Sequence, residues 1–179
     1  MLHVSGLGVE VGGKRVLDDV NLEVSEGEVH VLFGPNGSGK SSLIMSILGF
    51  PSYRVVSGKV WFKGKDITHL PTNERVKLGI SAAFQNPPAI RGVKLKDILR
   101  SLVSDSQEKD VKIRELAANI NFPLEFLGRD INLGFSGGEM KKSEVLQVLA
   151  QDADFVMLDE PDSGVDVENL QLIGRVINK

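Results

Sequence analysis

An eight-residue stretch, GPNGSGKS at residues 34–41, has the residue types and spacing of a phosphate-binding loop. It fits the pattern G-x-x-x-x-G-K-[ST] in full. Glycines let the backbone curl so that successive N–H groups point at phosphate oxygens, and a following helix adds partial positive charge. We expect Lys40 to reach the β- and γ-phosphates and Ser41 to bind Mg²⁺. The alternative is a glycine-rich turn with a surface lysine, which the flanking strand and helix patterns disfavour.

Two acidic residues, Asp159 and Glu160, follow the short apolar run FVML. Ligands of open parallel sheets bind beyond the carboxyl ends of the strands. Asp159 is therefore expected to hold Mg²⁺, directly or through water, and Glu160 to polarise an attacking water as a general base. Taken alone, the pair could equally be a solvated acidic turn before Pro161. The upstream phosphate loop favours the functional interpretation.

The stretch GFSGGEMKKSEVLQ at residues 134–147 contains a capping box, in which Ser136 and Glu139 close a helix N-terminus. The box leaves Gly137 and Gly138 unexplained, because each glycine costs a helix about 1 kcal/mol relative to alanine. Glycines suit a backbone that a phosphate must approach closely. Since the chain's own loop already holds a triphosphate, this second anion site suggests a ligand bound by another copy of the protein.

The sequence predicts several β-strands before and between these motifs. The alternation at 19–24 predicts a half-buried strand, and the apolar β-branched run at 28–33 predicts a buried strand that ends at the phosphate loop. Residues 58–67 predict strand, turn and strand, typical of an antiparallel flank. Residues 79–84 and 155–158 predict two further short strands, the latter central and parallel.

Helical patterns alternate with these strands. A helix is expected at 40–49, closed by Gly49, and a short helix capped by Thr72 or Asn73 is expected to run through Lys77. The order of strand, loop, helix and later strand predicts an α/β fold with a mostly parallel sheet.

The helical content is greatest in the second half of the chain. Residues 87–142 predict a helical subdomain inserted in the α/β core, and a helix follows at 138–150. With 179 residues, we expect a single domain, 1–179, that carries this subdomain.

Composition narrows the class of protein. The net charge of −3 gives no reason to expect nucleic-acid binding. The chain has no cysteine, which excludes disulfides and thiolate metal sites and permits a reducing cytoplasm. No signal peptide and no apolar stretch long enough to span a bilayer is present, so we expect a cytoplasmic protein without direct membrane insertion.

The motif set resembles that of ABC-type ATPase cassettes over nearly the whole chain. The phosphate loop, Gln85, FSGGE at 135–139, FVMLDEP at 155–161 and SGVD at 163–166 occur in the family's order. The resemblance implies a P-loop NTPase fold that binds and hydrolyses ATP with Mg²⁺, and an ATP-dependent head-to-tail homodimer. Asp166 would link the two active sites.

The resemblance also implies roles for individual residues. Glu160, Gln85 and Lys40 would be catalytic, and Ser41, Gln85 and Asp159 would hold the metal. Gln85 would also report to a partner docked on the helical subdomain, and Ser136 and Gly138 would contact the γ-phosphate bound by the other copy. The expected nucleotide contacts are Gly34, Pro35, Asn36, Gly37, Ser38, Gly39, Lys40, Ser41, Ser42, Ser136, Gly137 and Gly138.

Within these cassettes, three segments are most similar to the SufC family of iron–sulfur cluster assembly ATPases: FQNPPAIRGV at 84–93, SGGEMKKSEVLQ at 136–147 and DEPDSGVD at 159–166. That similarity implies SufB- and SufD-like scaffold proteins as partners, docked near residues 86–93. The alternatives are the ATP-binding subunit of a membrane transporter, a DNA-repair cassette, disfavoured because no sustained heptads occur, and a non-catalytic binding module.

The chain departs from the family pattern in several places. Val11 stands where cassettes often stack an aromatic ring on adenine, so weak base preference is expected, and Arg91 replaces a usual proline. A switch histidine is expected about thirty residues beyond SGVD, where the chain has ended. From this we expect the C-terminal part of the core to be missing and the chain to hydrolyse ATP weakly.

Overall fold

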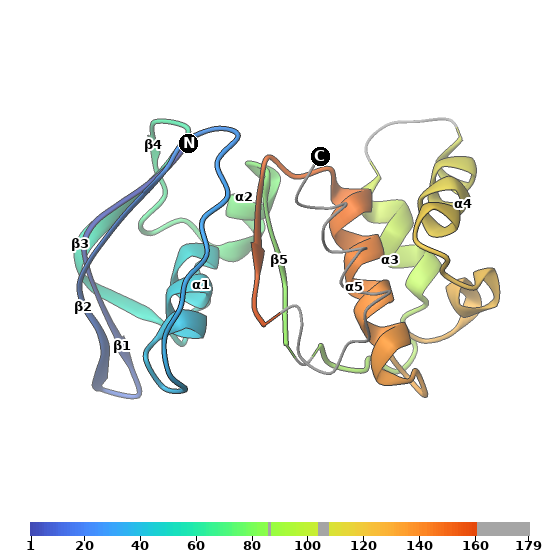
Figure 1. The fold of residues 1–179 in the computed structure, drawn as a ribbon, viewed down its shortest axis with the longest axis horizontal. Coiled ribbons are helices and arrows are strands. Elements are labelled where there is room, and N and C mark those ends of the chain that lie inside the picture. Colours follow the sequence, from blue (N-terminus) through green and yellow to red (C-terminus); the bar gives the residue numbers. More distant parts are fainter. Residues whose placement is uncertain (86, 104–107, 161–179) are drawn as a thin grey trace. The chain divides into compact units, whose positions relative to one another are not determined.

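The computed structural model describes residues 1–85, 87–103 and 108–160, which form two compact units, Met1–Ile80 and Ser81–Lys179. Figure 1 shows the helices and strands along the chain. Their order is β1 (Leu2–Val11), β2 (Lys14–Val24), α1 (Lys40–Leu48), β3 (Arg54–Phe62), β4 (Lys65–Asp66), α2 (Thr72–Lys77), β5 (Ile80–Ala83), α3 (Leu95–Leu102), α4 (Lys109–Asn119), the 3₁₀ helix η1 (Leu124–Gly128), α5 (Gly137–Gln151) and β6 (Phe155–Leu158). The α/β class with an antiparallel and a parallel sheet is confirmed.

The first unit is built on an antiparallel sheet with strand order β2-β1-β3-β4. Leu2 pairs with Val24 on one side and with Phe62 on the other, and all three side chains are buried. Along the second half of β2, Val20, Leu22 and Val24 are more buried than the residues between them, which is the alternation that the sequence pattern predicts. The half-buried strand at 19–24 and the strand–turn–strand at 58–67 are therefore confirmed, although β2 and β3 both begin earlier than predicted.

Helix α1 follows the phosphate loop and begins at Lys40, and its N-cap residue, Gly39, has a left-handed φ of 99°. A Cβ atom at Gly39 would come within 2.7 Å of Leu17, so glycine is required there for space as well as for conformation. The helix ends at Gly49, as predicted, again with a left-handed φ of 76°. Both ends of the helix are thus set by glycines that the sequence makes visible.

Arg75 of α2 ties the end of α1 to the segment that follows the sheet. Its guanidinium is 2% exposed and donates to the carbonyl oxygens of Ser46 and Ile47 in α1 at 2.9 and 2.8 Å. It also donates to Leu70 O at 2.7 Å and Thr68 O at 2.9 Å. Burial lowers the pKa of Arg75 to about 10, which leaves it charged at neutral pH. Two of these four bonds reach carbonyl groups in the last turn of α1, where intrahelical donors run out.

The predicted cap of the short helix α2 is wrong. The helix begins at Thr72, after Pro71, and no side chain caps it. The Thr72 hydroxyl donates instead to Gly49 O at 2.9 Å, because the chain passes close to the end of α1 at this point.

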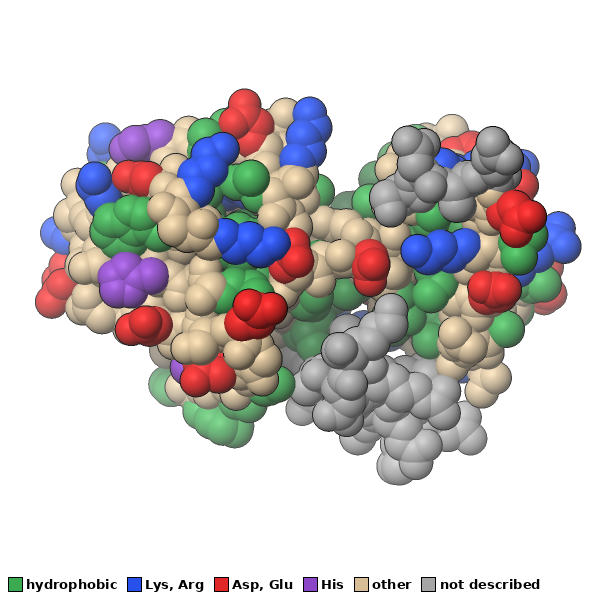
Figure 2. All heavy atoms as spheres, turned by 90° about the horizontal axis from the view of Figure 1, so that it is seen from above, with side chains coloured by type: hydrophobic (Ala, Val, Ile, Leu, Met, Phe, Trp, Pro, Cys, Tyr) green, Lys and Arg blue, Asp and Glu red, His purple; other side chains and the backbone are tan. Residues whose placement is uncertain are grey.

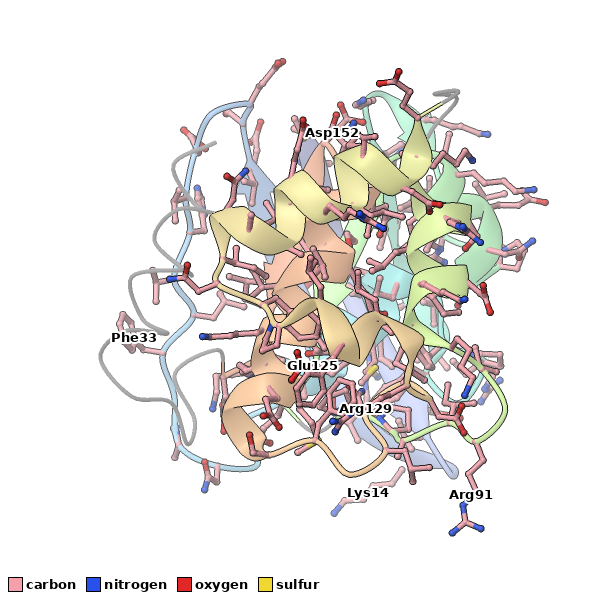
Figure 3. The ribbon with its side chains drawn as sticks, turned by 90° about the vertical axis from the view of Figure 1, so that its right-hand side faces the viewer. Lys14, Phe33, Arg91, Glu125, Arg129 and Asp152 are labelled. Atoms are coloured by element: carbon pink, nitrogen blue, oxygen red, sulfur yellow. The ribbon has the colours of Figure 1, made fainter. Side chains whose placement is uncertain are left out.

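The buried strand predicted at 28–33 is also wrong. These residues form no strand, and the exposed fractions of Val29 and Phe33 are 60% and 91%. Phe33 projects outward in Figure 3. A strand needs a partner for its N–H and C=O groups, and among the described residues the two sheets contain only β1–β4 and β5–β6. The apolar composition of the segment is real, but no ladder is available to pair it.

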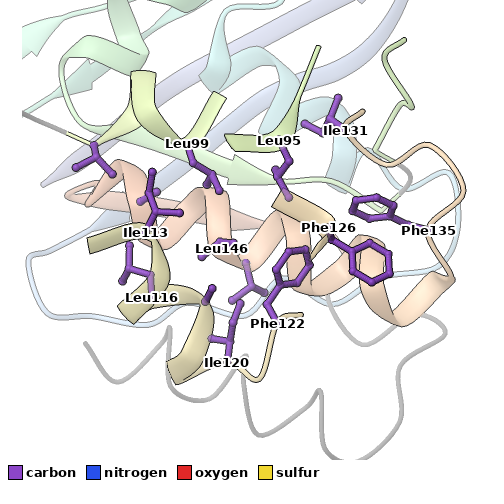
Figure 4. Close-up of a cluster of buried hydrophobic side chains, with 14 residues drawn as sticks. Leu95, Leu99, Ile113, Leu116, Ile120, Phe122, Phe126, Ile131, Phe135 and Leu146 are labelled. Carbon is purple, nitrogen blue, oxygen red and sulfur yellow. The ribbon is translucent and has the colours of Figure 1, made fainter. Parts of the chain in front are cut away.

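The second unit combines a short sheet, β5 and β6, with a layer of helices. Both strands and helix α5 are confirmed where the sequence predicts them. The helices enclose a core in which Phe122, Phe126 and Phe135 lie in contact (Figure 4). The cluster consists of Leu95, Leu99, Val103, Ile113, Leu116, Ala117, Ile120, Phe122, Phe126, Ile131, Phe135, Val145, Leu146 and Ala150. Helix α5 contributes three of these residues and is thereby fixed in its unit.

Several predictions fall on residues 161–179, outside the described part of the chain. They are the SGVD motif, with the expected role of Asp166, and the part of the DEPDSGVD segment that follows Glu160. In the described ranges, no helix is long and apolar enough to cross a membrane. On the face drawn in Figure 2, acidic and basic side chains are interspersed rather than gathered by sign.

Candidate functional site

The phosphate loop, residues 34–41, lies in the first unit. Its Lys40 is the first residue of helix α1. The Lys40 ammonium curls back over the loop and donates to Gly34 O at 2.8 Å and Pro35 O at 3.2 Å. Most of the loop is exposed, and Gly37 has a left-handed φ of 81°. The Lys40 ammonium therefore lies beside the loop backbone, whose N–H groups are expected to bind phosphate oxygens. The other predicted contacts, Asn36, Ser38, Ser41 and Ser42, lie within or directly after this loop.

The second unit brings Gln85 and Glu160 together, although 75 positions separate them in the sequence. Asp159 N donates to Ala83 O at 3.0 Å, so the ends of β5 and β6 lie side by side. Beyond those ends, Gln85 Nε2 donates a hydrogen bond to Glu160 Oε2. Asp159 is buried beside them. Three of the predicted metal-binding and catalytic residues thus follow adjacent strand ends.

The predicted capping box at the start of α5 is present. Ser136 N donates to Glu139 Oε2 at 2.6 Å, and Glu139 N donates to Ser136 Oγ at 3.4 Å. The hydrogen bonds from Ser136 lower the pKa of Glu139. A Cβ atom added to Gly137 would meet nothing within 4 Å, so the chain's own packing does not require glycine there. Among the described residues, the space where a Gly137 side chain would lie is empty.

Sequence analysis did not single out two buried charged residues of α5, Lys141 and Glu144. Glu144 Oε2 accepts from Phe84 N at 2.8 Å, and Lys141 Nζ donates to Phe84 O at 3.3 Å. Burial raises the pKa of Glu144 to about 7, although the bond from Phe84 and the charge of Lys141 both lower it. The signal was available, because Lys141, Glu144 and Val148 recur at three- and four-residue spacing and therefore lie on one helix face, which the structure buries.

The donor set fits ATP and Mg²⁺ in its chemistry. Hydroxyl, amide and carboxylate oxygens, here those of Ser41, Gln85 and Asp159, are the ligands that Mg²⁺ prefers. The phosphate loop carries backbone N–H groups and the Lys40 ammonium, which are the kinds of donor that phosphate oxygens accept. In the described part of the chain, no cluster of three or more His, Cys, Asp or Glu residues offers an all-protein metal site.

The family model described as "ABC transporter" matches residues 17–163, which include the phosphate loop, Gln85, the capped α5 helix and the acidic pair. The chain belongs to the ABC transporter family of ATP-binding cassettes. The cassette is 38% identical to "Vegetative protein 296" of Bacillus subtilis, over 99% of the chain and 72% of that protein. It is 40% identical to "Probable ATP-dependent transporter ycf16" of Cyanidium caldarium, over 100% of the chain and 75% of that protein.

Solved structures give the same assignment for this cassette. A nucleotide-free ATP-binding cassette from an ABC transporter superposes with a TM-score of 0.80 at 26% identity, covering 99% of this chain and 76% of the other. A dimeric cassette in a post-hydrolysis state, bound to ADP and Pi, superposes with a TM-score of 0.80 at 22% identity, covering 99% and 83%. At 22% identity, the similarity to the dimeric cassette is evidence for the fold alone. The predicted P-loop NTPase fold is confirmed.

Proposed function

We propose that this cassette hydrolyses ATP to ADP and phosphate as the ATPase subunit of an iron–sulfur cluster assembly complex. The hydrogen bond between Gln85 and Glu160, beyond two paired strand ends, is the observation that carries the hydrolytic part. It puts an amide that can orient water beside a carboxylate that can accept its proton. Water would attack the γ-phosphorus while the bond to the bridging oxygen of ADP breaks.

The remaining roles are distributed over the two units. Lys40 and the N–H groups of residues 34–42 would bind the phosphates. Ser41, Gln85 and Asp159 would hold Mg²⁺, whose charge offsets that of the phosphate oxygens. Glu160 would take the proton of the attacking water, and Gln85 would orient that water. The metal and the residue roles rest on donor chemistry and on the family resemblance.

The α5 N-terminus is proposed to contact the nucleotide bound by a second copy of the chain. The open space at Gly137 supports this role, because glycine is not needed there for the chain's own packing. The capping box leaves other N–H groups of the first turn available. Ser136 and Gly138 would then contact the γ-phosphate across an ATP-dependent homodimer.

The partner class is proposed from three sequence segments, 84–93, 136–147 and 159–166, which are similar to the SufC family. Structural support comes from the loop that precedes α3, where Ile90 is exposed and Arg91 points outward (Figure 3). SufB- and SufD-like scaffold proteins would dock there. The alternative partner is a membrane permease, and the name "Probable ATP-dependent transporter" of a 40%-identical relative favours it.

A pull-down from the native cell extract, with proteins identified by mass spectrometry, separates the two partner classes. We expect soluble scaffold proteins to be recovered with the tagged chain and to be lost with Ile90→Asp. Val56→Asp, which alters an exposed apolar residue of β3, is the matched control and should recover them fully. Recovery of an integral membrane permease in place of the scaffold would establish the transporter alternative.

A further inference from the structure

Phe84 is the residue between the end of β5 and Gln85, and two side chains of α5 hold its backbone. Its N–H donates to Glu144 at 2.8 Å, and its C=O accepts from Lys141 at 3.3 Å. The C=O of Phe84 belongs to the same planar peptide as the N–H of Gln85. The Lys141 bond therefore fixes the orientation of the peptide that leads directly into Gln85.

Lys141 and Glu144 are both ionisable and both buried, which is unusual for side chains that serve only a structural contact. Both residues are buried, with exposed fractions of 8% for Lys141 and 7% for Glu144. Burying an ionisable group costs free energy that a neutral serine or asparagine would avoid. A strand end that needed only its hydrogen bonds satisfied could use water or a neutral side chain.

Lys141 and Glu144 contact the chain next to Gln85, one of the two residues proposed to act in hydrolysis. Ala83 is held beside Asp159 by a backbone hydrogen bond, so the strand ends are in register. Gln85 lies two residues beyond Ala83, and its amide reaches Glu160. The two bonds to Phe84 restrain the backbone between Ala83 and Gln85. We infer that Lys141 and Glu144 are positioning residues that fix Gln85 toward Glu160.

The inference rests on the proposed hydrolytic function for its consequence, but its geometry can be tested without activity. The backbone ¹⁵N order parameter of Gln85 is measured in the wild-type chain and in Glu144→Ala and Lys141→Met. We expect a fall from about 0.85 to below about 0.6 in both variants. Glu144→Gln keeps an oxygen acceptor for Phe84 N–H and should restore the wild-type value.

A control separates positioning from a general loss of stability. Val145→Ala removes two methyl groups from the adjacent residue of α5, whose side chain packs in the helical core instead of against Phe84. It should leave the order parameter of Gln85 unchanged. A value for Glu144→Ala and Lys141→Met equal to wild type, or an equal fall in Val145→Ala, would overturn the inference.

The catalytic consequence is measured on the same variants. We expect kcat for ATP to fall about tenfold or more in Glu144→Ala with KM nearly unchanged, because misplacing an orienting group affects the reaction more than binding. Glu144→Gln should recover kcat. A wild-type chain that hydrolyses no ATP would refute the proposed function, whereas the order parameters would still decide the positioning role.

Discussion

Gln85 and Glu160 are joined by a hydrogen bond, and each lies just beyond the end of one strand of the β5–β6 sheet. The bond orients the Glu160 carboxylate with a neutral donor from the neighbouring loop. Glu160 also has a left-handed φ of 46°, uncommon for a residue with a side chain. Local strain of this kind is often retained at functional positions.

Replacing Glu160 by glutamine should abolish hydrolysis and preserve ATP binding. Glutamine keeps the size and an oxygen acceptor for Gln85 but cannot accept a proton from water, so we expect kcat to fall about 100-fold or more. Phosphate release and nucleotide binding are measured in parallel. Glu125→Gln, which alters a glutamate of η1, is the control. Hydrolysis at the wild-type rate in Glu160→Gln would show that Glu160 is not the base.

Replacing Lys40 by alanine should weaken nucleotide binding. The ammonium that now contacts Gly34 O and Pro35 O would be lost, and with it the charge expected at the β- and γ-phosphates. We expect the Kd for ATP to rise about 100-fold, measured by calorimetry. Lys65→Ala in β4 removes an exposed lysine of the same unit and should bind normally. Normal binding by both variants would remove Lys40 from the site.

Replacing Ser136 by arginine should block ATP-dependent pairing without affecting binding by the monomer. The long side chain would fill the open space at the start of α5. Ser136→Ala is measured alongside, because it removes the hydroxyl, with its cap and its proposed phosphate contact, at a cost of about 1 kcal/mol in helix stability but adds no bulk. Sedimentation with and without ATP measures pairing. If Ser136→Arg lost binding as a monomer, Ser136 would act on the chain's own nucleotide.

Removing the Arg75 guanidinium should destabilise the first unit strongly. Arg75→Met keeps much of the side-chain volume but leaves four carbonyl groups without their charged donor. We expect the free energy of unfolding in urea to fall by at least about 3 kcal/mol. Arg54→Ala, which breaks an exposed pair with Glu10, should cost less than about 1 kcal/mol. Equal losses would show that burial of the guanidinium contributes nothing.

The raised pKa of Glu144 should make stability fall as pH rises. The ordinary pKa of a glutamate side chain, taken for the unfolded chain, is 4.5, and the pKa of Glu144 in the folded chain is about 7. Between these values the folded state binds the proton more tightly than the unfolded state does, so stability present at pH 4.5 is lost by about pH 8. The Lys141 charge and Phe84 N–H reduce this loss without reversing it.

Urea unfolding of wild type and Glu144→Gln at pH 4.5 and pH 8 measures the effect. The difference between the two proteins isolates Glu144, because other groups titrate alike in both. We expect the wild type to lose on the order of 3 kcal/mol relative to the variant over this range. Parallel pH profiles would mean that Glu144 titrates normally in the folded chain.

Local features of the fold were predictable because neighbouring residues decide them. The capping box at Ser136, the glycine that ends α1 and the alternating strand of β2 each depend on a few adjacent positions. The wrong predictions concern contacts with distant residues. Thr72 bonds to Gly49 rather than capping its own helix, and the run at 28–33 pairs with no strand among the described residues.

The sequence by itself determined which residues could do chemistry: the curled loop before Lys40, the acidic pair after FVML and the capped helix at Ser136. Their types and local spacing suffice, because phosphate, metal and cap chemistry each demand particular atoms. Only the tertiary structure decided that Gln85 meets Glu160 and that Lys141 and Glu144 hold Phe84. Those contacts join residues 57 to 75 positions apart, and strand pairing and helix packing alone bring them together.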